Sequence, residues 1–493
     1  MGFWEVCCLM DERKFETDAA EQFLDEVEEQ ISYKTVKKSV RRELEEHIMD
    51  RTEAYEKDGF SHEQAVKKAV QNMGDAVSIG IHLNEIHHVQ KTPGFLILTG
   101  ILLLAGFGYA GYMQWTPEQE ANGFWYYIPG VIVLAAAIWK GYPVLVYHRK
   151  KLMFLLGCFY AMQLIVFFSV RFGDAVYAFR LGTVTNDYFA VLLSALIGTF
   201  LLYRFRQNGE RALLVFGILL AAVYMMQAER AFYISETAVL VLYLSAAASA
   251  FFMVYRRILS GRRIRLYAEV LAGCLLFGGV LMETGGQTNL QVFLRPEQSV
   301  ESTWDDAYNG ILIRELLGRT PLTRGLSLSP EEMMDYGTGA WYFASRDEQQ
   351  IGHRIGDAED VALWDILPQH SHNNYLIAVT IFQFGWLAGL LLVGGIGVFY
   401  VWLFSYILRI WGQMASVLSW TCGMLLLWQS VLYILGNFGY QYATFPNLPL
   451  ISEGRMSILV HMMLLGFILS SYRYDRVVDD RQDTEIRLRR KEG

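Results

Sequence analysis

The residues best suited to chemistry lie in two short polar segments, each directly before a long apolar stretch. The first segment contains Asp365 and Asn374, and the second contains Glu453. A carboxylate can take a proton from a hydroxyl group, whereas the amide of Asn374 can hold a hydroxyl only by hydrogen bonds. We therefore expect Glu453 and Asp365 to be candidate general bases, because both should lie near the outer mouth of a helix bundle.

Two histidines and one arginine accompany these residues. His370 and His372 could begin a metal site, but no third ligand has a recognisable spacing, so the sequence predicts no metal site. We interpret both histidines as loop residues near the membrane surface. Arg455 could bind a pyrophosphate through parallel hydrogen bonds, or it could pair with Glu453 or with lipid headgroups.

The composition indicates a membrane protein that positions these segments between helices. The chain has 493 residues, 53% of them hydrophobic and 19% charged, with a mean hydropathy of +0.24 and a net charge of −8. These values exclude a disordered chain and are untypical of a soluble enzyme. Blocks of about twenty apolar residues match the length that a helix needs to cross a membrane. The blocks predict an all-α polytopic membrane protein with ten spans, at 94–114, 124–147, 152–170, 188–204, 212–227, 236–255, 265–284, 383–408, 414–436 and 455–471.

Sequence signatures of several other protein classes are missing. The chain has no Walker loop, no HExxH zinc helix and no Rossmann glycine pattern, which leaves an ATP-driven pump unsupported. Its five cysteines form neither a disulfide framework nor a CxxC pair.

Basic residues predict the orientation in the membrane. The short loops after the second, fourth and sixth apolar blocks contain clusters of Lys and Arg, and cytoplasmic loops carry such an excess. We therefore expect both termini in the cytoplasm. The segment 285–373 then forms a large loop outside the cell.

A small soluble helical domain is predicted before the membrane spans. Its apolar residues recur at helical spacing, and Ser61 followed by Gln64 is a capping-box signature. The stretch from Glu45 to His88, which includes Gly59-Phe60-Ser61 and Met73-Gly74-Asp75, resembles the permease-prefix type of helical domain. We divide the chain into an extension (1–13), a cytoplasmic prefix domain (14–91), the membrane domain (94–471) and a charged cytoplasmic tail (472–493).

Two motifs around the polar segments resemble the SEDS family, the RodA and FtsW type of cell-wall proteins. Leu367-Pro368 and the run from His372 to Val379 are similar to the family's Leu-Pro-Glu and His-Thr-Asp-Phe, Ala-Val sequences. Asn437-Phe438-Gly439 and the run from Leu448 to Gly454 resemble its Asn-Ile-Gly and Leu-Pro-Phe-Ile-Ser-Tyr-Gly sequences. The motifs flank the eighth and ninth apolar blocks in the family's order. The resemblance covers about 94–471.

This resemblance implies a role in cell shape, division or sporulation through peptidoglycan synthesis in the bacterial cytoplasmic membrane. The implied reaction polymerises lipid II, a disaccharide-peptide on polyprenyl pyrophosphate, with a class B penicillin-binding protein as partner and no nucleic acid. The family's catalytic Asp corresponds to Asn374. No cofactor is predicted, although Mg²⁺ or Mn²⁺ near the departing pyrophosphate stays an open alternative. The residues expected to bind substrate are His372, Arg455, Asn437, Ser452 and Arg314.

Two alternatives remain at this point. Since Asn374 is no base, the chain could be a non-catalytic SEDS-like scaffold, or a regulator of a wall-synthesis complex that receives a signal through the prefix domain. It could also be a lipid-linked glycan transferase of the O-antigen-ligase type, which has many spans and a large external loop as well. That alternative predicts that His372 or Arg314 matters more than any carboxylate.

Overall fold

All regular secondary structure in the described part of the chain is helical. The computed structural model describes residues 18–114, 124–155, 157–158, 203–215, 217, 235–343, 361, 363–368, 371–443, 446–452 and 454–478. Every regular element in these ranges is a helix, which confirms the predicted all-α class. The chain divides into two compact units, Met1–Lys91 with Arg473–Gly493, and Thr92–Tyr472.

Four helices of the first unit bury a shared apolar core. They are α2 (Asp18–Glu29), α3 (Lys34–Lys57), α4 (His62–Gln71) and α5 (Ala76–Ile86). Leu24 and Val27 of α2 and Val36 and Ile48 of α3 are almost fully buried in this core. The start of α4 is as predicted, because the Ser61 hydroxyl accepts a hydrogen bond from the backbone N–H of Gln64.

Seven long apolar helices of the second unit coincide with predicted spans, which confirms a multi-pass membrane protein. They are α6 (Pro93–Gln114), α7 (Tyr127–Tyr147), α11 (Glu236–Tyr255), α12 (Arg263–Leu281), α20 (Trp386–Leu408), α21 (Gln413–Asn437) and α22 (Arg455–Tyr474). Within the described ranges six of them are long and apolar enough to cross a membrane, and the apolar part of α6 is shorter. The predicted spans at 152–170, 188–204 and 212–227 lie largely outside the described residues.

The structure refines two helix boundaries. The helix α12 does not stop near residue 284 but continues through a π-helical turn, Met282–Gly286, into α13 (Gln287–Leu294). The block 383–408 is interrupted at Gly385, so that α19 (Leu376–Phe384) ends before α20 begins. Gly385 has φ = +91°, which glycine adopts readily. Hydropathy marks where an apolar block ends. The helix can nevertheless continue past the end of the block, as after α12, or be interrupted inside the block, as at Gly385.

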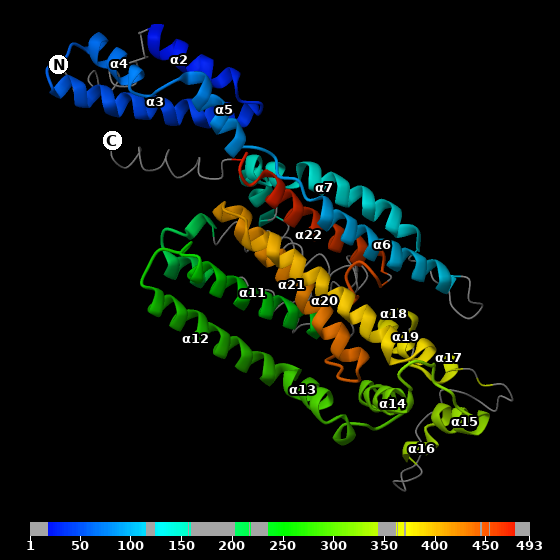
Figure 1. Cartoon of the computed structure of the whole chain (residues 1–493). Coiled ribbons are helices and arrows are strands. Elements are labelled where there is room, and N and C mark those ends of the chain that lie inside the picture. Colours follow the sequence, from blue (N-terminus) through cyan, green and yellow to red (C-terminus); the bar gives the residue numbers. More distant parts are fainter. Residues whose placement is uncertain are drawn as a thin grey trace. The chain divides into compact units, whose positions relative to one another are not determined.

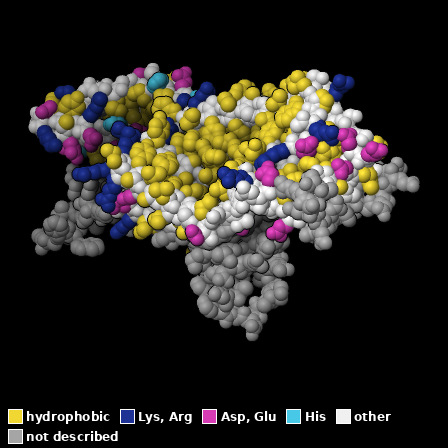
Figure 2. Space-filling view, turned by 90° about the horizontal axis from the view of Figure 1, so that it is seen from below, with side chains coloured by type: hydrophobic (Ala, Val, Ile, Leu, Met, Phe, Trp, Pro, Cys, Tyr) yellow, Lys and Arg dark blue, Asp and Glu magenta, His cyan; other side chains and the backbone are white. Residues whose placement is uncertain are grey.

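The spanning helices of the second unit expose apolar side chains and bury polar ones. Leu275 on α12 and Leu391 on α20 are each 70% exposed, as is Val401. Ser419 and Asn437 on α21 are fully buried. Figure 2 shows hydrophobic side chains spread over a broad face of the molecule. This distribution is expected where lipid rather than water surrounds the helices.

Short helices between α13 and α20 gather at one end of the helix bundle (Figure 1). They are η3 (Pro296–Gln298), α14 (Asp306–Arg319), α15 (Pro330–Thr338), α16 (Ala340–Phe343), α17 (Leu363–Ile366), α18 (Ser371–Asn374) and α19. Tyr308 of α14 is fully buried and stacks on Phe343, while its hydroxyl accepts a hydrogen bond of 2.9 Å from the Trp341 indole. This aromatic cluster connects α14 with α16.

Candidate functional site

Asn437, the last residue of α21, holds the segment that contains Asn374. Its Oδ1 accepts hydrogen bonds from the backbone N–H groups of Ile377 (2.9 Å) and Ala378 (3.1 Å). Its Nδ2 donates to the carbonyl oxygens of Asn374 and Tyr433, each at 2.9 Å. The side chain therefore caps the first turn of α19 and fastens the end of α18 to α21. All four contacts are to backbone groups, which makes Asn437 a positioning residue.

Tyr433 reinforces the same connection one helical turn earlier on α21. Its hydroxyl donates to the carbonyl oxygen of Asn373 at 2.6 Å and accepts from the backbone N–H of Leu376 at 3.1 Å. Because Tyr433 and Asn437 are four residues apart, they lie on one face of α21. Tyr433 lies outside both sequence motifs, although this spacing from Asn437 is a signal that could have indicated it.

The second motif reaches the first one through side-chain amides. The Asn373 Nδ2 lies 3.4 Å from Asn447 Oδ1, and Asn447 Nδ2 donates to the Ser457 hydroxyl at 2.7 Å. Ser452 is buried and donates to the carbonyl oxygen of Leu448 at 3.2 Å, which tightens the turn before α22. The segments of the two motifs, joined by contacts such as that between Asn373 and Asn447, thus form one polar group of residues at the end of the bundle, called the motif assembly below.

A third connection leads from the first motif to Asp306, an acid that lies outside both sequence motifs. The Tyr375 hydroxyl donates to Gln441 Oε1 at 2.8 Å, and both residues are buried. The Gln441 Nε2 donates to the carbonyl oxygen of Ala443 at 3.0 Å, and the Gln441 side chain is close enough to the carboxyl of Asp306 to lower its pKa. Only the fold could reveal this, because Asp306 and Gln441 are far apart in sequence.

The surroundings of Asp306 change its acidity. Partial desolvation of the carboxyl raises its pKa above the usual aspartate value, although the residue keeps an exposed surface. Hydrogen bonds from Gln441 and Asn309 act in the opposite direction, and the charge of Asp305 adds to the increase in pKa. A carboxyl with such a raised pKa is a stronger base when ionised than an ordinary solvated aspartate.

Arg314 supports the turn that follows α21. Its Nε donates to the carbonyl oxygen of Gly439 at 3.0 Å, and the guanidinium lies 4.1 Å from the centre of the Tyr440 ring. Its Nη1 also lies 3.6 Å from the Glu297 carboxylate. Gly439 has φ = +79° and packs against Arg314, so a side chain there would strain the turn and collide. The described contacts of Arg314 therefore lie within the protein.

The other predicted site residues occupy varied positions. Asn374 is half-buried at the end of α18, and Asp365 is exposed on α17. His372 belongs to α18 and Arg455 begins α22, but only their backbones are described. Glu453 and His370 lie outside the described residues. The structure brings Asn374 and Asn437 into direct contact.

The parts of the chain that the structure describes contain no group of three or more His, Cys, Asp or Glu residues able to hold a metal ion. The described side chains at this end of the bundle include carboxylate, amide, phenol, hydroxyl and guanidinium groups. These groups can bind sugar hydroxyls and, at Asp306 or Asp365, accept a proton.

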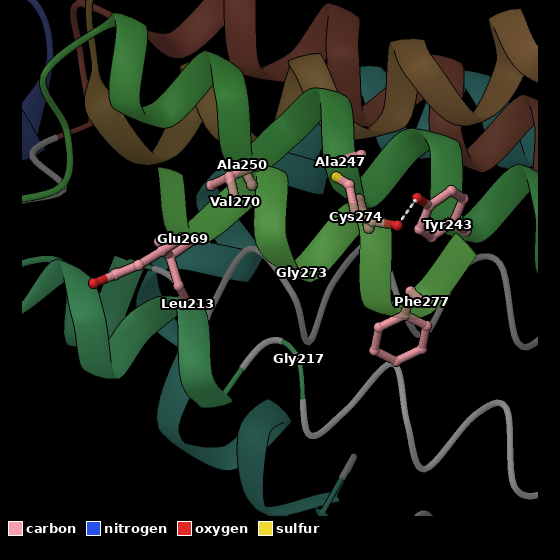
Figure 3. A pocket seen from close by; sticks show the side chains of 11 residues that line it. Leu213, Gly217, Tyr243, Ala247, Ala250, Glu269, Val270, Gly273, Cys274 and Phe277 are labelled. Carbon is pink, nitrogen blue, oxygen red and sulfur yellow. Dashed lines mark hydrogen bonds between the residues drawn. The ribbon is translucent and has the colours of Figure 1, made fainter. Parts of the chain in front are cut away.

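A separate cavity lies between α11 and α12 (Figure 3). Small residues such as Ala247, Ala250 and Gly273 form much of its lining, with Phe277 at its edge. The Tyr243 hydroxyl donates to the backbone carbonyl of Cys274 at 2.5 Å. Glu269 is the one carboxylate among the described lining residues. This apolar cavity lacks the polar groups of the motif assembly.

Comparison with known proteins gives two similarities. The chain is 27% identical over 175 residues to the probable peptidoglycan glycosyltransferase FtsW of Thioalkalivibrio sp. (strain K90mix). This match includes 34% of the chain, which spans about two fifths of the length of that relative (40%). No family model matches the chain.

The second similarity is to solved structures. One chain of a peptidoglycan synthase complex, described for its coordination of polymerization and crosslinking, has the same fold with a TM-score of 0.51 at 15% identity. That alignment covers 79% of this chain and 99% of the other. The rod shape determining protein RodA of Thermus thermophilus aligns with a TM-score of 0.41 at 15% identity, over 78% of this chain and 97% of that protein.

Proposed function

We propose that this chain, a multi-pass membrane protein of the SEDS family, binds lipid II and polymerises it into peptidoglycan glycan strands. The relative from Thioalkalivibrio is named a probable peptidoglycan glycosyltransferase, and the synthase complex that shares the fold couples polymerization with crosslinking. The motif assembly contains amide and phenol groups, which can form hydrogen bonds to the hydroxyl groups of a sugar-phosphate substrate.

One observation carries the proposal. The segment with Asn374 and the end of α21, where the second motif begins, are joined through the side chain of Asn437. Both segments contain the sequence runs by which the chain resembles the SEDS family. A binding groove for an extended glycan needs polar groups on a rigid backbone, because the groups that will hydrogen-bond the sugar must be in position before it binds.

The proposed reaction needs a base other than the side chain of Asn374. Its amide can orient a sugar hydroxyl but cannot take a proton near neutral pH. Asp365 and Glu453 are the acids that the sequence offers for this role. His372, Arg455, Ser452 and Arg314 are proposed to line the groove, with Arg455 facing the pyrophosphate.

The non-catalytic alternative is favoured by Asn374 itself. A SEDS-like protein without a base could still bind lipid II or hold a wall-synthesis partner in place. The O-antigen-ligase-like alternative makes His372 or Arg314 essential, whereas the described contacts of Arg314 support a turn.

We also propose the partner and the orientation. A class B penicillin-binding protein is the expected partner, because the synthase complex with the same fold couples polymerization and crosslinking. Both termini are proposed to face the cytoplasm, where residues 14–91 would receive a signal as a prefix domain. Helices α14–α19 would then lie outside the cell.

The test is glycan-chain formation from lipid II by the purified full chain in nanodiscs. Wild type would be compared with Asn374→Asp, Asp365→Asn and Glu453→Gln. Chains from wild type that disappear in one acid variant support a polymerase with a relocated base. Tight lipid II binding without chains in any variant supports the non-catalytic alternative, and essential His372 or Arg314 with a different lipid-linked glycan supports the ligase-like one.

A further inference from the structure

We infer that Asp306 supplies the carboxylate that Asn374 cannot supply, and that it acts as the general base on the acceptor sugar hydroxyl. This inference rests on the proposed polymerase function. It names a residue outside both motifs, on α14, which the fold connects to the first motif through Gln441 and Tyr375.

The connection is short and uses buried side chains. Gly310, one helical turn after Asp306 on α14, packs against the backbone of Gly439, which brings the start of α14 to the segment that contains Gln441. The Gln441 side chain is close enough to the Asp306 carboxyl to act on its pKa, and Gln441 accepts the hydrogen bond of Tyr375 at 2.8 Å. Tyr375 directly follows Asn374, whose carbonyl oxygen is held by Asn437. The Asp306 carboxyl is thus attached to the segment in which the family places its acid. Because Gln441 and Tyr375 are only 6% and 2% exposed, their mutual hydrogen bond is shielded from water.

The adjacent acid, Asp305, has a different task. Its Oδ2 accepts hydrogen bonds from the backbone N–H groups of Glu301 and Ser302, each at 2.7 Å, and its Oδ1 accepts from the Ser302 hydroxyl at 3.0 Å. Asp305 therefore stabilises the turn before α14. Asp306 keeps an exposed surface from which an incoming hydroxyl can reach the carboxylate.

Other carboxylates of the same helices are engaged with cationic or phenolic partners. Glu332 pairs with Arg319 at 2.6 Å, and the Tyr336 hydroxyl donates to Glu315 at 3.3 Å. An ion pair of this kind weakens a carboxylate as a base. Asp306 instead has neutral amide partners, and partial desolvation raises its pKa, as expected for a group that must take a proton near neutral pH.

The proposed step transfers one proton and one glycosyl group. The acceptor hydroxyl gives its proton to the Asp306 carboxylate while its oxygen forms a bond to the anomeric carbon of the donor sugar. The bond from that carbon to the pyrophosphate oxygen breaks, and its electron pair leaves on the lipid pyrophosphate. Asp306 then releases the proton to water, which restores the carboxylate.

The experiment measures lipid II polymerisation by the full chain in nanodiscs, together with lipid II binding and thermal unfolding. Asp306→Asn keeps the size of the side chain and an acceptor for Gln441, so it should fold and bind lipid II like wild type. We expect its polymerisation rate to fall by about 100-fold or more. Glu301→Gln removes the same charge from an exposed position in the same region, and it should stay within about twofold of wild type.

Two further variants separate catalysis from structure. Asp306→Glu, which keeps the carboxylate, should retain more activity than Asp306→Asn. Asn374→Asp combined with Asp306→Asn should recover part of the lost rate, because it returns an acid to the family position. A wild-type rate in Asp306→Asn overturns the inference, as does a loss of lipid II binding that accounts for the whole loss of rate.

The failure of this inference differs from the failure of the proposed function. If wild type is inactive and Asn374→Asp is active, the groove is that of a polymerase and Asp306 is not its base. If neither protein forms chains, the proposed polymerase function fails and the inference fails with it.

Discussion

In the first unit the most buried side chains are apolar, whereas in the second unit several of the most buried side chains are polar. Leu24 and Val27 form the centre of the first unit. In the second, Ser419, Asn437 and His461 are at most 1% exposed, while Leu391 is 70% exposed. The same chain therefore arranges its side chains in opposite ways for two surroundings.

This difference indicates where specificity resides in each unit. In water, burial of apolar area stabilises helices with little demand on exact partners. In lipid, apolar contact is available outside the protein too, so close packing and hydrogen bonds must select the correct arrangement. The polar side chains of the second unit are consequently the ones that hold the candidate site, as Asn437 illustrates.

The largest effect is expected from Asn437→Leu. It leaves the buried N–H groups of Ile377 and Ala378 without their acceptor, at about 1–3 kcal/mol each, or roughly 2–6 kcal/mol in all. The first turn of α19 and the end of α18 should loosen, and polymerisation should be lost. Denaturant unfolding of the detergent-purified protein, with lipid II assays alongside, measures both effects. Asn437→Asp keeps an acceptor for both N–H groups, so its stability should lie between those of wild type and Asn437→Leu. Equal stability of all three proteins would contradict the role of Asn437 in holding α18 and α19 to α21.

A matched pair of alanine substitutions compares the two interiors. Leu24→Ala in the first unit removes a fully buried apolar side chain and should cost about 2–5 kcal/mol. Ser419→Ala in the second unit removes a buried hydroxyl that has no hydrogen-bond partner among the described residues, so stability should stay the same or rise slightly. Limited proteolysis and thermal unfolding report the two units. A larger loss from Ser419→Ala would mean that its hydroxyl has a role within the bundle.

Much of the helical framework could be predicted from the sequence because it depends on local patterns. Apolar blocks gave the positions of α6, α7 and α20–α22, and the spacing of Ser61 and Gln64 gave the start of α4. The break at Gly385 could not be predicted, since the residues on both sides are equally apolar. Whether the chain turns there depends on the positive φ of Gly385 and on its packing against the turn at 322–324.

The candidate site was predictable only in part. Motif resemblance identified Asn374 and Asn437, but it gave no indication that the Asn437 amide makes all four of its hydrogen bonds to backbone groups. Gln441 and Asp306 were missed because their contact joins α14 to the segment after α21. Such long-range contacts depend on how helices pack, which no local pattern of residues encodes.

A lysine on each surface tests whether the exposed residues face different surroundings. Val398 lies near the middle of α20 and is 53% exposed, and Met49 on α3 is 45% exposed. Val398→Lys should cost about 2.5–3.5 kcal/mol if lipid surrounds α20, whereas Met49→Lys should change stability by no more than about 0.5 kcal/mol. Membrane insertion and yield of folded protein measure the first, and thermal unfolding the second. Similar small effects would place the exposed face of α20 in water or against a partner.

The smallest effect concerns a helix cap in the first unit. Asp75 precedes α5, and its Oδ2 accepts hydrogen bonds from the Ser78 backbone N–H at 2.8 Å and the Ser78 hydroxyl at 2.7 Å. These bonds favour the ionised form and lower the pKa of Asp75 below its ordinary value of 3.8. A carboxylate with a lowered folded-state pKa stabilises the fold fully above the unfolded value. Its contribution is lost as the pH falls through the folded value.

Asp75→Asn keeps a good capping side chain but cannot titrate, so it separates the cap from its charge. Protection of α5 from hydrogen exchange in wild type should decrease as the pH is lowered from about 5 to about 3, beyond the intrinsic pH effect on exchange. In Asp75→Asn this additional decrease should be absent, and Asp75→Ala should lose protection at every pH. The same pH response in wild type and Asp75→Asn would show that a different group titrates. Water can solvate the charge of the exposed Asp75 cap in the first unit. In the second unit the side chain that caps α19 is the fully buried, uncharged amide of Asn437.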